Sequence, residues 1–236
     1  MCDKMNSALK FRIPTRIFLV ATLCFVLVQC ESRQEISWRN VINSAVELYE
    51  KGQYFEGLEV AEEALTLAEK NFGADHPNVA TSAWLLSKFY ITQRKYIEAE
   101  NICRRALIVA EKVSDEAQVG IILDGLAEIC LRQGKYTDAE ALSRRALTIL
   151  VKNYGPDNQV VGVAADNLAE IYKMQEKYKE ALLLYRRALE IIEKNLGPNH
   201  NRVASVMFDM AECYKKLGKE YEARILTENA LEIYFK

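Results

Sequence analysis

The sequence predicts an all-α protein, a solenoid of five helix-turn-helix units that occupies residues 36–236. Only 4 Pro and 10 Gly occur among the 236 residues, and stretches rich in Ala, Leu, Glu, Lys and Arg favour helix after residue 36. A triplet centred on Ala also recurs, with spacings of 42, 40, 42 and 42 residues. Its alanines are Ala64, Ala106, Ala146, Ala188 and Ala230. A fixed period of this length indicates a repeat architecture.

Each unit is predicted to contain two helices. A second column of small residues stands seven residues before the first, at Gly57, Ala99, Ala139, Ala181 and Ala223. In the fourth unit, Leu168, Ala169 and Tyr172 form an apolar face on the first helix, at spacings of three and four. Small residues at these columns allow two helices to approach closely. We expect the units at about 36–73, 77–113, 117–155, 159–197 and 201–236.

Two kinds of turn separate the predicted helices. Gly52, Gly134 and Gly218 stand at the turn inside three of the units. Between units, Gly73, Gly155 and Gly197 follow the second helix, where a left-handed cap is expected. Asp or Asn then precedes the next helix and is expected to be its N-cap. The link around 114–116 is two residues shorter and has neither Gly nor Pro, which explains the single spacing of 40.

The fourth unit carries a recognisable motif. The segments Leu168-Ala169-Glu170-Ile171-Tyr172, 177–181 and Arg187-Ala188-Leu189 together resemble a tetratricopeptide repeat. The 42-residue period and the Gly-Pro-Asn-His link at 197–200 are similar to the longer variant typified by kinesin light chain. The resemblance covers about 200 of the 236 residues. It implies a right-handed superhelix whose concave face is lined by the first helix of each unit and binds other proteins.

The same resemblance implies which side chains line the concave face. The candidate partner-binding residues are Trp84, Lys88, Asp124, Glu128, Asp166, Glu170, Phe208 and Glu212. The acids among them would form a stripe across three units, flanked by the two aromatic residues. A peptide with Lys or Arg and an apolar anchor would suit such a groove. The alternative is that these acids are ordinary surface residues without a ligand.

The N-terminal segment 1–29 has the layout of a secretory signal peptide or membrane anchor. Basic residues precede the apolar run Ile17–Val28, which is short for a membrane span. The run ends in a sequence that resembles a bacterial lipobox, in which Cys30 would be lipidated, although Gln29 departs from that pattern. We therefore expect an exported, membrane-tethered protein with a short linker at 30–35. Plain secretion, an uncleaved anchor and a cytoplasmic protein are the alternatives.

The residues that usually carry catalysis are sparse. The two histidines, His76 and His200, stand in inter-unit turns. Cys103, Cys130 and Cys213 lie in predicted helices and form no metal or disulfide pattern. We expect no enzymatic activity, no cofactor and no metal. Without the first 29 residues the chain has 27 Lys and Arg against 32 Asp and Glu, and this net charge of −5 argues against nucleic acid as the partner.

The leading interpretation is a protein-binding scaffold. An intracellular adaptor similar to kinesin light chain, and an accessory subunit of a secretion or envelope-assembly complex, are the alternatives. The last helix adds a candidate surface for self-association, formed by Leu226, Ala230 and Phe235.

Overall fold

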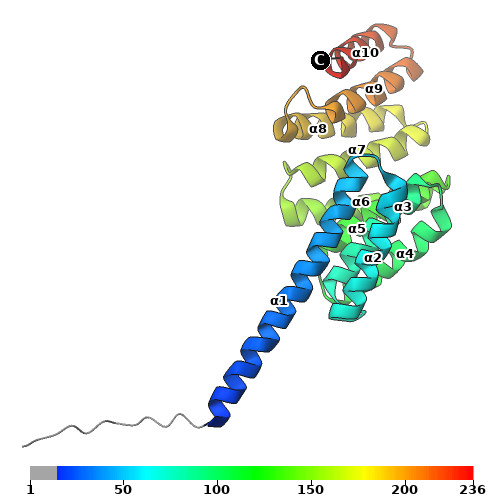
Figure 1. The fold of residues 1–236 in the computed structure, drawn as a ribbon. Coiled ribbons are helices and arrows are strands. Elements are labelled where there is room, and N and C mark those ends of the chain that lie inside the picture. The colour runs from blue at the N-terminus through cyan, green and yellow to red at the C-terminus, as the bar shows by residue number, and fades with distance from the viewer. Residues whose placement is uncertain (1–14, 236) are drawn as a thin grey trace, which may run out of the picture.

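The computed structural model describes the backbone of residues 15–235 and the side chains of residues 33–235. This part of the chain folds into ten α-helices without a strand (Figure 1). They are α1 (Thr15–Glu50), α2 (Tyr54–Phe72), α3 (Pro77–Thr92), α4 (Tyr96–Lys112), α5 (Glu116–Arg132), α6 (Tyr136–Tyr154), α7 (Gln159–Met174), α8 (Tyr178–Leu196), α9 (Asn201–Lys216) and α10 (Glu220–Tyr234). The predicted all-α, right-handed superhelical solenoid of five helix pairs is confirmed.

The order of the contacts shows which helices line the inner side of the curve. Every helix packs against its neighbours in the chain. Each odd-numbered helix from α1 to α7 also packs against the next odd-numbered helix. In the described part of the chain the even-numbered helices lie further apart, and long side chains bridge them, as in the ion pairs Arg105–Glu69 and Arg145–Glu111. Helices on the inside of a bend lie closer together than those on the outside. The odd-numbered helices therefore line the concave side, as the sequence predicts.

The small-residue columns let the helices pack closely. Ala99, Ala139 and Ala181 are fully buried between helices. The first unit has Gly57 in this column, and a Cβ built there would lie 2.4 Å from Cε1 of Phe89. Phe89 itself stands where the later units have Ile129 or Ile171. The glycine is therefore matched to a larger neighbour in the next unit.

The turns follow the prediction in part. Gly52, Gly134 and Gly218 have φ between 72° and 75°. Arg94 and Glu176 hold the equivalent position in the other two units at φ of 58° and 61°, where a side chain is unfavourable. The inter-unit glycines were expected in the left-handed helical region, but this is wrong. Gly155, for example, has φ 82° and ψ 160°, a region that is essentially restricted to glycine.

The N-caps also differ from the prediction. Asn158 is a cap as expected, because its Oδ1 accepts from the Val160 amide at 2.9 Å. At two other links the cap is a histidine, since His76 and His200 each accept an amide hydrogen through Nδ1. Asp75 was expected to cap α3, but it pairs with Lys112 instead. At these two links the histidine stands one residue after the Asp or Asn that was expected to be the cap, and its Nδ1 accepts the hydrogen bond instead.

The N-terminal predictions concern residues at the edge of the description. Helix α1 begins at Thr15, so the segment 30–35 that was predicted as a linker is helical, consistent with its lack of Gly and Pro. Residues 1–14 and the side chains of the apolar run and of Cys30 lie outside the described residues. Within residues 33–235, none of the helices is long and apolar enough to cross a membrane.

Candidate functional site

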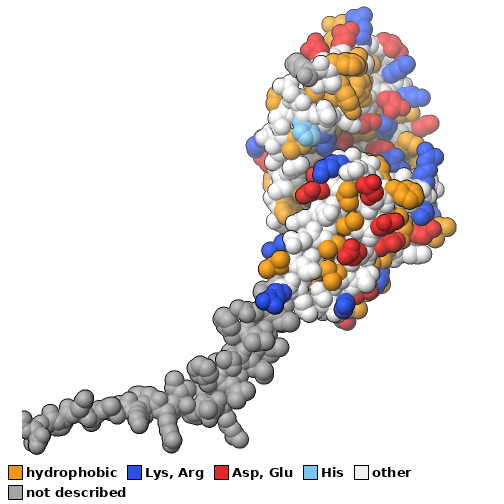
Figure 2. Space-filling model, viewed as in Figure 1, with side chains coloured by type: hydrophobic (Ala, Val, Ile, Leu, Met, Phe, Trp, Pro, Cys, Tyr) orange, Lys and Arg blue, Asp and Glu red, His pale blue; other side chains and the backbone are white. Residues whose placement is uncertain are grey.

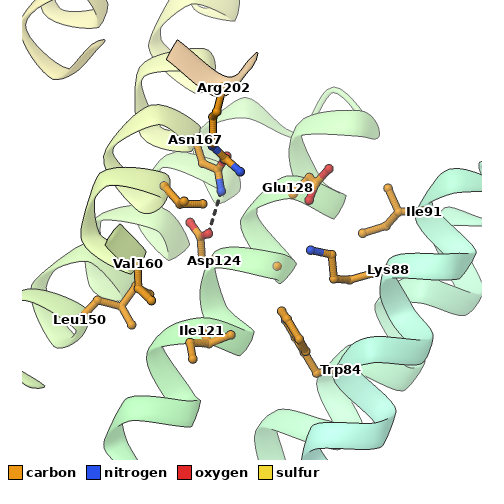
Figure 3. A pocket seen from close by; sticks show the side chains of 12 residues that line it. Trp84, Lys88, Ile91, Ile121, Asp124, Glu128, Leu150, Val160, Asn167 and Arg202 are labelled. Carbon is orange, nitrogen blue, oxygen red and sulfur yellow. Dashed lines mark hydrogen bonds between the residues drawn. The ribbon is translucent and has the colours of Figure 1, made fainter. Parts of the chain in front are cut away.

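A cavity of about 460 Å³ opens on the concave side between α3, α5, α7 and α9. We call it the inner cavity (Figure 3). It is lined by Trp84, Lys88, Ile91, Ile121, Asp124, Gly125, Glu128, Leu150, Val160, Val163, Asn167 and Arg202. Four predicted site residues, Trp84, Lys88, Asp124 and Glu128, therefore meet in one place. The other four, Asp166, Glu170, Phe208 and Glu212, do not line it.

One end of the inner cavity is apolar. Figure 3 shows Ile121, Leu150 and Val160 grouped at this end, with the Trp84 indole facing them across the space. The ring lies close to the backbone of α5, because a Cβ built on Gly125 would lie 3.3 Å from the Trp84 Nε1. Two sequence features therefore shape this end together, a tryptophan on α3 and a glycine on α5.

The other end is polar and incompletely hydrogen-bonded. Asn167 Nδ2 donates to Asp124 Oδ2 at 2.7 Å, while the buried Asp124 Oδ1 and the buried Arg202 Nε have no hydrogen-bond partner. Burial raises the pKa of Asp124 to about 6, although the hydrogen bond from Asn167 and the nearby cations oppose the shift. Buried polar atoms without partners are rare in folded proteins, because each costs free energy. These two atoms are therefore the unsatisfied hydrogen-bonding groups of the residues at this end of the inner cavity.

Lys88 lies at the edge of the inner cavity among aromatic rings. Its Nζ is 4.9 Å from the ring centre of Tyr49 and 5.2 Å from that of Trp84. No carboxylate lies within 4.0 Å of this ammonium in the described part of the chain. Burial lowers the pKa of Lys88, which the charges of Glu128 and Asp124 partly offset. Cation–π contacts with two rings hold the charge in place of an ion pair.

The predicted acidic stripe is not an open row of carboxylates, and this expectation is corrected. Arg202 Nη2 lies 3.6 Å from Asp166, and Arg132 Nη1 lies 3.4 Å from Glu170. A further lysine, Lys173, contacts Glu212 at 3.0 Å. The cations come from inner positions of neighbouring units, so the stripe is a mixed network of charges.

The acids of this network are strongly influenced by burial. Burial raises the pKa of Asp166 to about 7, and Asp209 and Glu170 add to the shift, while Arg202 opposes it. Burial also raises the pKa of Glu170, against the attraction of Arg132. Carboxylates held this way have lost much of their hydration without full compensation.

The structure bears on two predictions about the last unit, namely that Phe208 lines the binding face and that α10 leaves an apolar face uncovered. Phe208 is half-buried, with its ring 6.1 Å from that of Tyr234, so it contacts α10 and lies away from the inner cavity. Ala230, expected on an uncovered face, is fully buried. Phe235 is 85% exposed, and Tyr221 is 65% exposed. Figure 2 shows apolar side chains gathered at this end of the array, in the region of α10.

The other eight residues that line the inner cavity were not among the predicted site residues, and three of them, Gly125, Asn167 and Arg202, shape its chemistry. Gly125 and Asn167 each stand one residue after a predicted inner position. Arg202 stands seven residues before Asp209, which occupies the same column as Asn167. Seven residues are nearly two helical turns, so Arg202 lies on the same face. This second inner column was the signal that could have located them.

The cysteines have no chemical role in the inner cavity. Cys103, Cys130 and Cys213 are buried free thiols. Burial raises the pKa of Cys103 to about 12 and that of Cys213 to about 11, which disfavours the reactive thiolate. Among residues 33–235, no group of three or more His, Cys, Asp or Glu residues could hold a metal ion.

Comparison with known proteins identifies the family to which this repeat architecture is similar. Four overlapping segments, residues 40–112, 83–150, 118–194 and 163–234, match the family model described as tetratricopeptide repeat. A comparison with curated proteins finds no match.

Solved structures with a similar fold include kinesin-light-chain-like proteins and Rap proteins. A kinesin-light-chain-like protein of Podosopora anserina with nearly identical TPR-like repeats is 21% identical, with a TM-score of 0.65, over 83% of this chain and 93% of that one. BtubC from P. vanneervenii is 18% identical, with a TM-score of 0.66, over 88% and 91%. The Rap conjugation gene regulator of plasmid pLS20, in complex with the Phr* peptide, is 16% identical, with a TM-score of 0.69, over 85% of this chain. The match spans 54% of that regulator.

Proposed function

The chain belongs to the tetratricopeptide repeat family, and on that premise we propose that it is a non-enzymatic interaction module. It holds a segment of a partner protein along the concave side of the array, against α3, α5 and α7. The observation that supports this most is the inner cavity itself. It lies on the side formed by the odd-numbered helices, and it contains a buried acceptor and a buried donor without partners.

Charge supports the same proposal. The inner cavity has two acids, Asp124 and Glu128, and two bases, Lys88 and Arg202. Neither a strongly acidic nor a strongly basic ligand matches such a lining, whereas a protein segment offers main-chain amides and mixed side chains. The Rap regulator was solved in complex with a peptide, which is consistent with a peptide ligand for an array of this fold.

A site-specific crosslink tests the proposed function. A photoreactive phenylalanine analogue at Ile91, on the rim of the inner cavity, is compared with the same analogue at Leu183. Leu183 is 66% exposed on α8, a helix that contributes nothing to the inner cavity. We expect the Ile91 variant to crosslink one defined segment of a partner, which mass spectrometry can map. Equal crosslinking of that segment at both positions would contradict the proposal.

The location of the protein is a separate part of the proposal. The apolar run at 17–28 and the lipobox-like sequence before Cys30 support an exported module that is tethered to a membrane by a lipid on that cysteine. Intact-mass measurement on the native protein separates the possibilities. The proposal predicts a chain that begins at a lipidated Cys30, whereas a full-length mass would favour an intracellular adaptor.

Self-association through α10 is proposed as a minor property. The exposed apolar side chains Tyr221, Ile225 and Phe235 support it. Light scattering at increasing protein concentration should then show dimers that an Ile225→Glu variant lacks. A strictly monomeric wild-type chain would contradict self-association without affecting the peptide-binding proposal.

A further inference from the structure

The inner cavity is amphipathic, so its two ends favour different chemical groups of a ligand. The apolar end offers Trp84 and Ile121, and the polar end offers one buried acceptor, Asp124 Oδ1, and one buried donor, Arg202 Nε. We propose that the inner cavity is a specificity pocket for one uncharged side chain of the bound segment, a carboxamide on an aliphatic stem, as in glutamine or asparagine. This inference rests on the proposed function of the concave side.

The balance of charge argues against a charged side chain. A lysine or arginine could approach Asp124, but its cation would face Arg202 and Lys88, which are held at the same cavity. A glutamate could approach Arg202, but its anion would face Asp124 and Glu128. A charge moved from water into this space would have one of its attractions cancelled by a repulsion, and it would still lose its hydration.

The two atoms without partners argue against a purely apolar side chain. A leucine or norleucine side chain would fill the apolar end, yet it would leave Asp124 Oδ1 and Arg202 Nε buried and unsatisfied. A carboxamide donates through its nitrogen and accepts through its oxygen at the same time. A hydroxyl, in contrast, must do both through one oxygen atom. The carboxamide is therefore the group that satisfies both atoms best.

The shape of the inner cavity fits the stem of such a side chain. In Figure 3, Asp124 lies between the apolar group around Ile121 and the polar group around Asn167. A side chain that passes Trp84 therefore meets apolar surface before its head reaches the polar end. The existing hydrogen bond from Asn167 to Asp124 Oδ2 fixes the carboxylate, so that Oδ1 remains the atom to be satisfied.

Capped amino acids test the pocket without knowledge of the natural partner. The full chain is labelled with 5-fluorotryptophan, and its two tryptophans, Trp84 and Trp38, provide a reporter in the inner cavity and an internal control. Trp38 is buried elsewhere, with its Nε1 bonded to Ser82 at 2.9 Å. The N-acetyl, N-methylamide forms of glutamine, glutamate, lysine, norleucine and tyrosine are titrated at millimolar concentrations.

We expect the glutamine probe to shift the Trp84 fluorine resonance and to leave that of Trp38 unchanged. Its dissociation constant should be lower than that of each other probe by about tenfold or more, the loss that accompanies an unsatisfied buried hydrogen-bonding group. Equal or stronger binding of the glutamate, lysine, norleucine or tyrosine probe would overturn the inference. So would the absence of any shift at Trp84.

Charge-changing variants provide a readout that a purely structural role would not move. Arg202→Met and Lys88→Met each leave the inner cavity with an excess of negative charge, so preference should move toward the lysine probe. Asp124→Asn should move preference toward the glutamate probe. Unchanged preference in folded variants would overturn the inference. Failure of the pocket inference can be told apart from failure of the proposed function, because the crosslink at Ile91 tests the proposed function by itself.

Discussion

Replacing Asp166 with Asn should stabilise the protein at pH 8, although it removes an ion pair. The Asp166 carboxylate is only 18% exposed and lies 3.6 Å from Arg202. Its pKa is raised from 3.8 to about 7, mainly by burial, so the attraction of Arg202 does not compensate for lost hydration. The folded state thus binds this proton more tightly than the unfolded state does.

The sign and the size of the effect follow from linkage. Below pH 3.8 the carboxyl is protonated in both states and contributes no pH-dependent term. Between pH 3.8 and about 7 the unfolded state loses its proton first, so stability falls, and the full penalty is present above pH 7. A pKa difference of this size corresponds to about 4 kcal/mol. Because solvent still reaches the group and an amide must also be desolvated, we expect a gain of about 2 kcal/mol at pH 8.

Urea unfolding of the full-length chain, followed by circular dichroism, measures this gain. The midpoint for Asp166→Asn should rise above that of the wild type at pH 8, and most of the difference should disappear at pH 4. Asp157→Asn is the matched control. Lys194 lowers the pKa of the exposed Asp157, so its replacement should bring no gain. Destabilisation by Asp166→Asn at pH 8, or an equal gain at both pH values, would refute the reasoning.

Three further predictions concern packing, turns and the ion pairs between units. Gly57→Ala should lower the unfolding free energy by about 1–2 kcal/mol in urea titrations, and Phe89→Ile in the same chain should restore most of the loss, because the new Cβ meets the Phe89 ring. Arg94→Gly should raise the thermal midpoint, with a gain of about 1 kcal/mol, since φ is 58° there, while Gly134→Ala should lower it. Burial raises the pKa of Glu140, but Lys177 and Arg144 outweigh it and hold the pKa at about 2. Glu140→Gln should therefore cost about 1 kcal/mol at pH 7, less than the pKa shift alone implies because solvent screens the exposed partners, and this cost should shrink as pH falls from 4.5 toward 2. A cost that is constant with pH would contradict that assignment.

The fold could be predicted because each unit repeats the same pattern of small and apolar residues. Ala99, Ala139 and Ala181 keep one register, and their burial is the reason that the register is kept. Details that depend on two units at once were less accessible. In the sequence, Gly57 is an unexplained departure from the alanine column. The structure gives the reason, because the Phe89 ring of the following unit occupies the space of a Cβ. The histidine caps were missed because the usual preference for Asp and Asn at helix starts was applied one residue too early.

The site was predictable in position and less so in charge. Trp84, Lys88, Asp124 and Glu128 were located from the helical register and the family's geometry, and they line one cavity. The pairing of the acids could not be derived the same way, because it depends on the rotation and rise between successive units. Arg202, for example, reaches Asp166 of the preceding unit. A single-helix pattern has no information on such distances.

The central claim is that a partner segment lies in the inner cavity, and one binding measurement tests it most directly. The segment mapped by the Ile91 crosslink is synthesised as a peptide and titrated against the wild type, Trp84→Ala and Ile97→Ala. Ile97 is 72% exposed on α4 and does not line the inner cavity. We predict that Trp84→Ala weakens binding by about tenfold or more, a loss typical of a buried aromatic anchor, while Ile97→Ala binds like the wild type. Equal affinity of the wild type and Trp84→Ala would contradict the account.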